Sequence, residues 1–289
     1  MTIRKRICPS RHSLWFMLVF LISASFAVSS ENLGRFDPER DLYLAHFDLR
    51  TDVDDVHSVA AVATMLADPR FSDVSYHTVA GAYGFQEGLY VPADELFVEA
   101  FGANWSDRHG DPETALREVT DLSRTTLESG GSVWIAEGGQ SDFSAELFRE
   151  LREVLPNFDP RVQFHVVQHS RWNENTTTPA DLESLREYAN YVKIPDGNRG
   201  DNGSPNFRTG EVVEWKEQVK DARLQEIWEM AIATANRFNG VEGRFLNTYV
   251  ESGGLDFSDV VETAWIFGFD DLEDVHAFFE EFSSEGGVK

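Results

Sequence analysis

The stretch Asp41–Asp55, DLYLAHFDLRTDVDD, decides which fold this chain is expected to adopt. Its first part, Asp41–Phe47, is short and mostly apolar, which is typical of a buried strand. Its second part carries four aspartates in eight residues, namely Asp48, Asp52, Asp54 and Asp55. Beyond them, apolar residues recur at helical spacing at Val59, Ala60, Val62, Ala63 and Leu66. The segment therefore predicts a strand, an acidic turn and a helix in direct succession.

Strands and helices are expected to keep alternating downstream. The expected strands are Val74–Ala80, Ser132–Ala136, Val162–Gln168 and Tyr191–Ile194. The expected helices are Asp94–Phe101, Pro112–Ser129 with Asp111 as its cap, Ser144–Val154, Asp181–Tyr188 and Arg223–Arg237, and Pro195–Gly210 is expected to be a long loop. This order predicts an α/β fold: a mainly parallel, open sheet with helices on both faces. Ligands bind such sheets at the carboxyl ends of the strands, where the acidic turn falls.

The composition excludes two classes of protein. The 289 residues include 50 Asp plus Glu against 25 Lys plus Arg, which gives a formal net charge of −25. Because 42% of the residues are hydrophobic and 22 are Phe, the chain is not a disordered polyanion and a packed core is expected. Phosphate backbones repel so acidic a surface, so we expect no nucleic-acid partner.

Residues 1–29 are expected to form a signal peptide. The basic residues Arg4, Lys5, Arg6 and Arg11 precede the apolar run Leu14–Phe26, and small residues follow it. The run is shorter than the roughly 20 residues that a spanning helix needs, so no stable membrane insertion is expected after cleavage. We therefore expect export, to the periplasm or as a secreted protein. Residues 30–289 are expected to form a single α/β domain that is mostly helical after residue 210.

The four aspartates of the acidic turn repel one another unless a cation, protons or basic side chains compensate their charge. Capping of the following helix explains one of these carboxylates and leaves the other three without a role. Hard oxygen ligands close together in a loop suit Ca²⁺, and Mg²⁺ is the second choice. The sequence therefore predicts a metal-binding site at this turn.

The acidic turn resembles the N-terminal calcium-binding signature of the nucleoside hydrolase superfamily. Its spacing, continued through Ser58, is closest to a bacterial branch of nucleoside hydrolase-like proteins of uncertain substrate. Two further segments agree in order and spacing. Val79–Gly81 is similar to the end of the family's second strand, and Ala136–Asp142 resembles the turn after its third strand. The resemblance covers roughly residues 41–195 and implies a nucleoside hydrolase-like sheet.

The resemblance also implies roles for individual residues. It implies a calcium ion that contacts a water and two sugar hydroxyls, with the water attacking the anomeric carbon. The implied metal ligands are Asp48, Asp55, Ser141 through its backbone carbonyl, and Asp256, although a helix cap explains Asp256 equally well. Asp52 stands where the family usually has Gly and is expected as a further ligand or as the base. Asp52 and Asp54 are the expected catalytic residues. Substrate contacts are expected from Asp54, Asp142 and the run Trp172, Asn173, Glu174 and Asn175, which combines an aromatic plane with amides and a carboxylate.

One departure from the family pattern leaves two functions open. Arg50 stands where the family's enzymes have a catalytic aspartate, and an arginine accepts no proton from water, so Asp52 would have to act as the base. The first hypothesis is a calcium-dependent hydrolase of a glycosidic bond, in an N-riboside or a related small glycoside. The second is a calcium-dependent sugar-binding protein without catalysis. A small sugar or nucleoside is the expected partner in both, and a homo-oligomer is compatible with the sequence.

Overall fold

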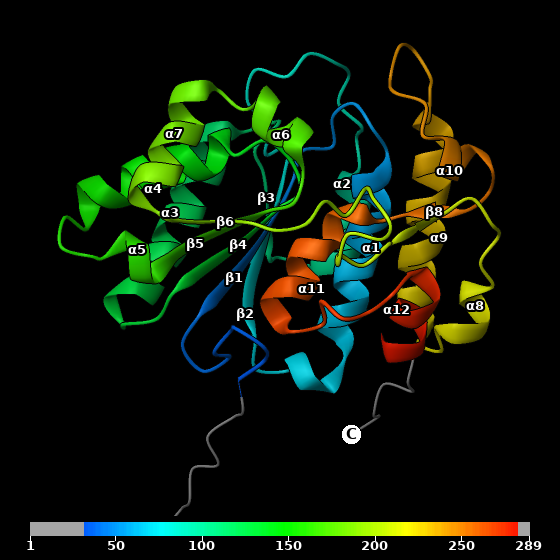
Figure 1. Cartoon of the computed structure of the whole chain (residues 1–289), viewed down its shortest axis with the longest axis horizontal. Coiled ribbons are helices and arrows are strands. Elements are labelled where there is room, and N and C mark those ends of the chain that lie inside the picture. Colours follow the sequence, from blue (N-terminus) through cyan, green and yellow to red (C-terminus); the bar gives the residue numbers. More distant parts are fainter. Residues whose placement is uncertain (1–31, 283–289) are drawn as a thin grey trace, which may run out of the picture. The chain divides into compact units, whose positions relative to one another are not determined.

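The computed structural model describes residues 32–282 (Figure 1). The predicted signal peptide, residues 1–29, lies outside the described residues. Within the described part of the chain, no helix has both the length and the apolar character that a membrane crossing requires.

Six strands form a central sheet in the order β3-β2-β1-β4-β5-β6. They are β1 (Leu42–Phe47), β2 (Ser75–Ala80), β3 (Trp105–Asp107), β4 (Val133–Glu137), β5 (Phe164–Gln168) and β6 (Asn190–Lys193). All neighbouring pairs are parallel, so the predicted α/β class with a mainly parallel sheet is confirmed. The strand order reverses between β1 and β4, and the carboxyl ends at such a reversal flank the crevice in which α/β sheets bind ligands.

Helices cover both faces of this sheet (Figure 1). One face is covered by α3 (Pro112–Glu128), α4 (Asp142–Val154), α5 (Pro160–Gln163) and α7 (Pro179–Tyr188). The other is covered by α1 (Asp54–Ala67) and α11 (Val261–Phe267), with α2 (Asp94–Phe101) and α9 (Ala222–Phe238) packed against α1. The shorter elements are η1 (Pro69–Phe71), α6 (Arg171–Thr176), β7 (Arg208–Thr209), α8 (Trp215–Gln218), α10 (Thr248–Glu251), β8 (Leu255–Asp256), η2 (Ser258–Val260) and α12 (Val275–Phe282). Strands β7 and β8 form a separate antiparallel pair.

Three local differences from the sequence prediction have simple causes. The fifth strand begins at Phe164 and not at Val162, because Asp159 caps a helical turn that runs to Gln163. The run Trp172–Asn175, for which no helix was predicted from the sequence, lies on helix α6, since the side chain of Ser170 accepts from the backbone N–H groups of Trp172 and Asn173. The three-residue strand β3 was not predicted, because its pairing with β2 depends on contacts far along the chain.

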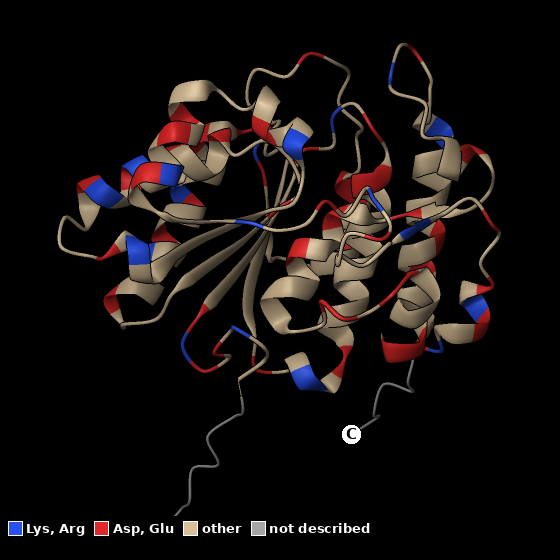
Figure 2. Cartoon of the chain, viewed as in Figure 1, with Lys and Arg blue, Asp and Glu red and all other residues tan. Residues whose placement is uncertain are grey.

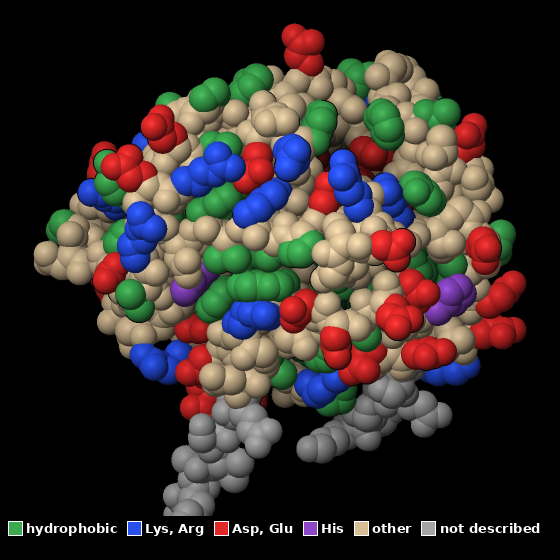
Figure 3. Space-filling view, viewed as in Figure 1, with side chains coloured by type: hydrophobic (Ala, Val, Ile, Leu, Met, Phe, Trp, Pro, Cys, Tyr) green, Lys and Arg blue, Asp and Glu red, His purple; other side chains and the backbone are tan. Residues whose placement is uncertain are grey.

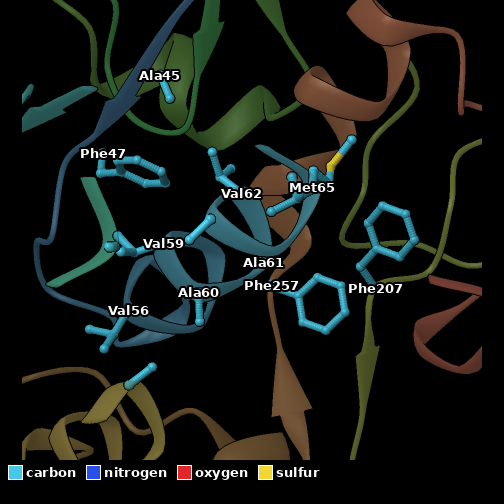
Figure 4. Packing of buried hydrophobic residues seen from close by; sticks show 14 of the residues in the cluster. Ala45, Phe47, Val56, Val59, Ala60, Ala61, Val62, Met65, Phe207 and Phe257 are labelled. Carbon is cyan, nitrogen blue, oxygen red and sulfur yellow. The ribbon is translucent and has the colours of Figure 1, made fainter. Parts of the chain in front are cut away.

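The apolar residues of β1 divide between the two sides of the sheet. Tyr43, Ala45 and Phe47 belong to the core that contains α1, whereas Leu42 and Leu44 belong to the core that contains α3 and α4. Burial on both faces explains why the strand is apolar throughout and does not alternate with polar residues. Figure 4 shows the apolar side chains of α1 in the first of these cores, which is the larger. Two cores on one strand hold its carboxyl end in a fixed place.

Candidate functional site

A pocket of about 410 Å³ opens at the carboxyl end of the sheet. Its walls come from segments that are far apart in the chain: the acidic turn after β1, Gly138 after β4, the start of α6, the loop before β7, and the region from Phe245 to Asp259. Five aspartates line it, namely Asp48, Asp52, Asp54, Asp256 and Asp259. Figure 3 shows acidic side chains at the bottom of a hollow on this face, with Lys and Arg side chains beside it. The pocket thus lies at the position that the strand order favours for a ligand.

The turn after β1 folds its own carboxylates inward. Asp48 accepts hydrogen bonds from the backbone N–H of Arg50 at 2.8 Å and from Nε2 of Gln140 at 2.9 Å. Asp54 and Asp55 occupy the first turn of α1, where the positive end of the helix dipole favours anions. The backbone N–H of Leu49 donates to Oδ2 of Asp55. Backbone groups of a short turn therefore fix two of the predicted metal ligands.

Burial and mutual repulsion raise the pKa values of these carboxyl groups. Loss of solvation is the largest cause in each, and it raises the pKa of Asp48 to about 7 and that of Asp52 to about 6. Loss of solvation and then the nearby carboxylates raise the pKa values of Asp54, Asp55 and Asp259 well above the ordinary value. Burial also raises the pKa of Asp256. These six aspartates, the acid cluster, need protons or a cation to share one site.

Basic side chains supply part of that compensation at one member, since the charge of Arg208 lowers the pKa of Asp256. Arg50 turns away from the acid cluster: its Nε donates to the carbonyl of Gly88 at 2.7 Å, and its guanidinium lies 4.3 Å from the centre of the Tyr83 ring. Across residues 32–282, no side-chain nitrogen of Lys or Arg lies within 4.0 Å of a carboxylate oxygen of the acid cluster. The nearest basic group is Nε2 of His169, which lies 3.9 Å from Oδ1 of Asp259.

Gly138 allows two members of the cluster to approach each other. A Cβ atom at this position would lie 3.3 Å from Oδ1 of Asp55, 3.3 Å from Cβ of Asp259 and 2.7 Å from the carbonyl of His46. The same Oδ1 of Asp55 is buried and has no hydrogen-bond partner among the described residues. A buried carboxylate oxygen without a partner is costly, and it therefore indicates a missing cation or proton.

Asp259 fits the role predicted for Asp256 better than Asp256 does. The carboxylate of Asp256 accepts hydrogen bonds from Nδ2 of Asn247 at 2.9 Å and from Oγ and the backbone N–H of Ser258 at 2.8 and 3.2 Å. The two bonds from Ser258 are the capping role that the sequence left open for Asp256. Asp259 carries no such bonds and interacts electrostatically with Asp54 and Asp55. Sequence reasoning missed it although it follows Asp256 by three residues.

The predicted substrate residues separate into two groups. Trp172 and Asn173 line the pocket, and the indole is 54% exposed at its mouth. Glu174 and Asn175 line a different surface depression, where Glu174 pairs with Arg186 at 2.6 Å. The reason is geometric, because successive residues of a helix point in directions about 100° apart. The expectation that all four residues face one ligand is therefore not met.

Ser141 and Asp142 begin α4 beside the pocket and do not line it. The carboxylate of Asp142 accepts the backbone N–H of Thr178 at 3.2 Å, which ties α4 to α7. Ser141 is fully buried, and its backbone N–H donates to Oγ1 of Thr177 at 3.1 Å. Asp142 thus has a structural partner in place of the predicted sugar contact.

Polar residues that sequence reasoning missed complete the pocket. Nδ2 of Asn247 lies 3.3 Å from Oδ1 of Asp52 and 2.9 Å from Oδ2 of Asp256, so one amide bridges two carboxylates. Asn198 and Arg208 form part of the wall, and Gln86 donates to the carbonyl of Arg50 at 2.6 Å. No local pattern identifies them, since each comes from a loop, a helix cap or the two-residue strand β7.

Buried histidines support the site from beneath. Nδ1 of His57 accepts the backbone N–H of Asp256 at 3.2 Å, and burial lowers the pKa of this histidine to about 4. Nδ1 of His169 lies 2.8 Å from Oε1 of Glu262. Nδ1 of His46 lies 3.4 Å from Oε1 of Glu137. The side chains of both histidines and both glutamates are fully buried. These histidines position the site, and none of them lines the pocket.

The acid cluster matches a hard cation in the chemistry of its donors. Within the described residues, no three His, Cys, Asp or Glu side chains already stand in a metal-coordinating arrangement. All members of the acid cluster nevertheless offer carboxylate oxygens, which Ca²⁺ and Mg²⁺ prefer. The partnerless oxygen of Asp55 points to the same requirement. The residues present therefore match the predicted ion in donor chemistry, and their side chains do not stand in coordinating positions.

Comparison with known proteins identified no similar protein. No protein-family model matches the chain, and neither the curated proteins nor the solved structures contain a match. The resemblance to nucleoside hydrolases rests on the motifs of the sequence and stays a prediction.

Proposed function

We propose that this protein hydrolyses a glycosidic bond of a small sugar-containing molecule, an N-riboside or a related glycoside, and requires Ca²⁺ or Mg²⁺. One observation carries the proposal: five of the six aspartates of the acid cluster line one pocket at the reversal of a parallel sheet, and in residues 32–282 no side-chain nitrogen of Lys or Arg lies within 4.0 Å of a carboxylate oxygen of the six. A purely structural role does not account for so much uncompensated negative charge, because burying it opposes folding.

Asp48, Asp55 and Asp259 are the residues that would hold the cation. The predicted ligand Ser141 is left out, because it does not line the pocket and its carbonyl accepts the backbone N–H of Ala145 at 2.9 Å. Asp55 offers a buried oxygen without a partner, and Asp259 lacks the hydrogen bonds that occupy Asp256. When bound, such an ion lowers the pKa of a bound water and orients sugar hydroxyls.

Asp52 is the proposed base. It lines the pocket, receives a hydrogen bond from Asn247 at 3.3 Å, and has a pKa raised to about 6, chiefly by burial. A carboxylate with that pKa is largely ionised at neutral pH and still takes up a proton more readily than an ordinary aspartate. Asp54 would accept hydrogen bonds from sugar hydroxyls, and Trp172 and Asn173 would contact the opposite end of the ligand.

The test uses the full chain with a panel of nucleosides and nitrophenyl glycosides in excess Ca²⁺. We expect turnover that a chelator abolishes. Asp52→Asn should lower kcat about 10²- to 10⁴-fold, because it removes the proton acceptor and keeps the shape of the side chain. Asp73→Asn is the matched control, since Asp73 is exposed and lies before β2, at the opposite end of the sheet. Absence of both turnover and binding across the panel would contradict the proposal.

The second candidate is a calcium-dependent sugar-binding protein without catalysis. The observation in its favour is that Arg50 has no proton-accepting atom in the place that the family pattern gives to a base, and instead contacts Gly88 and Tyr83. Calorimetric binding of a sugar that needs Ca²⁺ and is followed by no turnover would establish it. Turnover that Asp52→Asn abolishes would exclude it.

We further propose that the protein acts in the periplasm or outside the cell, on the basis of the signal peptide predicted for residues 1–29. Protein recovered from the exported fraction should begin near residue 30 when its N-terminus is sequenced. Full-length protein confined to the cytoplasm would contradict export.

A further inference from the structure

Two arginines line the pocket without a carboxylate partner. Arg50 and Arg208 both belong to its wall, and both are half-buried. Within residues 32–282, no Asp or Glu oxygen lies within 4.0 Å of either guanidinium. The chain has twice as many acidic as basic residues, so an ion pair with a carboxylate would be easy to form at each arginine. The lack of an ion pair at both therefore suggests another role for them.

Arg208 is held in place by neutral groups, and its charge acts on Asp256 without a direct ion pair. Its Nη1 donates to Oδ1 of Asn198 at 3.1 Å, and its Nη2 donates to the backbone carbonyl of the same residue. The guanidinium lies 4.7 Å from the centre of the Tyr249 ring. Oδ1 of Asn198 also lies 3.2 Å from Oγ of Ser258. Neutral partners therefore fix the guanidinium at the pocket wall without an ion pair to a carboxylate.

Arg50 is held in the same manner on another wall. Its Nε donates to a backbone carbonyl, that of Gly88, and an aromatic ring, that of Tyr83, lies under its guanidinium. The walls of the pocket therefore contain two arginines whose guanidinium groups are fixed by neutral partners.

The same face carries further basic side chains. Figure 2 shows Lys and Arg on α6, at the end of β6 and in the loop that leads to β7, and Figure 3 shows that they gather beside the hollow. These elements contain Arg171, Lys193 and Arg199, all exposed. Lys193 and Arg199 pair with Glu174 and Asp196 at 3.4 and 3.8 Å. Arg171 forms no ion pair among the described residues, so its positive potential favours the approach of an anion to a protein that is otherwise strongly acidic.

Simple compensation of the acid cluster does not explain Arg208. Arg208 on β7 lies opposite Asp256 on β8 in the antiparallel pair. No nitrogen of its guanidinium nevertheless lies within 4.0 Å of a carboxylate oxygen. An arginine that served only to neutralise Asp256 would form that ion pair, because a bidentate contact with a carboxylate is its strongest interaction.

We propose that Arg208, together with Arg50, binds an anionic group on the substrate, a phosphate or a carboxylate attached to the sugar. The inference rests on the proposed function, since it concerns the same pocket and the same class of ligand. A planar guanidinium that is already oriented matches the oxygens of either anion better than an ammonium group does. The substrate class becomes an acidic glycoside, such as a nucleotide or a uronide, and not a neutral nucleoside.

Calorimetry on the full chain in excess Ca²⁺ tests this inference with two pairs of probes, ribose against ribose 5-phosphate and glucose against glucuronate. Titration of each probe into the same buffer without protein corrects for its own binding of Ca²⁺. We expect the anionic member of at least one pair to bind about tenfold more tightly, as a charge-assisted contact implies. The pair that shows the preference tells phosphate from carboxylate.

The arginine variants locate the preference. Arg208→Gln should reduce the preference for the anionic probe about tenfold. Arg208→Lys should keep part of that preference, because lysine keeps the charge and lacks the planar fork of arginine. Arg50→Gln should weaken binding of the anionic probe in the same direction. Arg199→Gln is the matched control: this arginine is exposed on the same loop, pairs with Asp196 at 3.8 Å and does not line the pocket.

The outcomes separate this inference from the proposed function. Equal binding of the neutral and anionic probes would overturn the inference and leave the proposed function standing. An Arg208→Gln variant that loses Ca²⁺ and neutral sugars to the same degree as anionic sugars would also overturn it, because the arginine would then serve only the acid cluster. Absence of binding for every probe would overturn both.

Discussion

Single carboxylates of the acid cluster differ in how their oxygens are occupied. Asp256 uses both oxygens in hydrogen bonds to Asn247 and Ser258, whereas Asp55 uses one and leaves the other buried without a partner among the described residues. This difference, and not the count of acids, separates a capping residue from a proposed ligand.

Replacement of Asp55 tests this distinction. Asp55→Asn should weaken Ca²⁺ binding at least about tenfold, because it removes one ligand charge from the site. In a chelator, the same variant should unfold at a higher temperature than the wild type, since a like charge has left a buried cluster. Calorimetric titration with Ca²⁺ and thermal unfolding measure the two effects. A variant that binds Ca²⁺ as the wild type does would remove Asp55 from the ligand set.

At the scale of elements, the segment β8–η2 links the site to the core. Phe257 lies between Asp256 and Asp259, is fully buried, and stacks on Phe207 at 5.3 Å between ring centres. Its ring also meets Trp228 of α9 at 5.8 Å. Aromatic packing on one side of this segment therefore sets the position of the two aspartates that flank it.

Truncation of this anchor should affect stability and the site together. Phe257→Ala is expected to cost about 3–5 kcal/mol of unfolding free energy, as for other buried aromatic residues, and to weaken Ca²⁺ binding. Val162→Ala is the control, since Val162 is 61% exposed and its truncation should change stability by less than about 0.5 kcal/mol. Urea unfolding measures both. Unchanged Ca²⁺ affinity in a folded Phe257→Ala protein would show that the core does not position the aspartates.

For the whole molecule, the acid cluster makes stability depend on pH. In the unfolded chain its carboxyl groups lose their protons near pH 3.8, whereas in the folded protein Asp52 and Asp48 lose theirs near pH 6 and 7. The folded protein therefore holds more protons between these limits, and the cluster's contribution to stability falls as pH rises from about 4 to about 7.

Removal of divalent cations should expose this pH dependence. When the pH is raised from 5 to 7.5, the midpoint temperature of thermal unfolding should decrease. The decrease should be larger in a chelator than with Ca²⁺ present. At pH 7.5, Ca²⁺ at a hundredfold excess over its Kd should stabilise the protein by about 2.7 kcal/mol. That corresponds to a rise of about 5–10 °C for a chain of this size. Scanning calorimetry at both pH values measures these shifts. A midpoint that does not change when Ca²⁺ is added at pH 7.5 would contradict a cation site.

Local patterns were enough to predict the main elements. The apolar run of β1, the periodicity of α1 and the cap of α3, where Asp111 accepts from the N–H of Thr114, all depend on residues that are neighbours in the chain. The acidic turn was found for the same reason, since its four aspartates lie within one loop. Contacts between distant segments gave no such signal, so Asp259, Asn247 and Arg208 were missed.

The sequence by itself determined the α/β class and the place of the acidic turn at the end of the first strand, because periodicity and turn chemistry are local. Only the tertiary structure decided which side chains share the pocket. It turned Glu174 and Asn175 away through the rotation of α6, and tied Asp142 to Thr178. It brought Asp259 and Arg208 from the far end of the chain to the acidic turn. Which residues meet depends on how helices and loops pack across the sheet, and that packing is not encoded in any short segment.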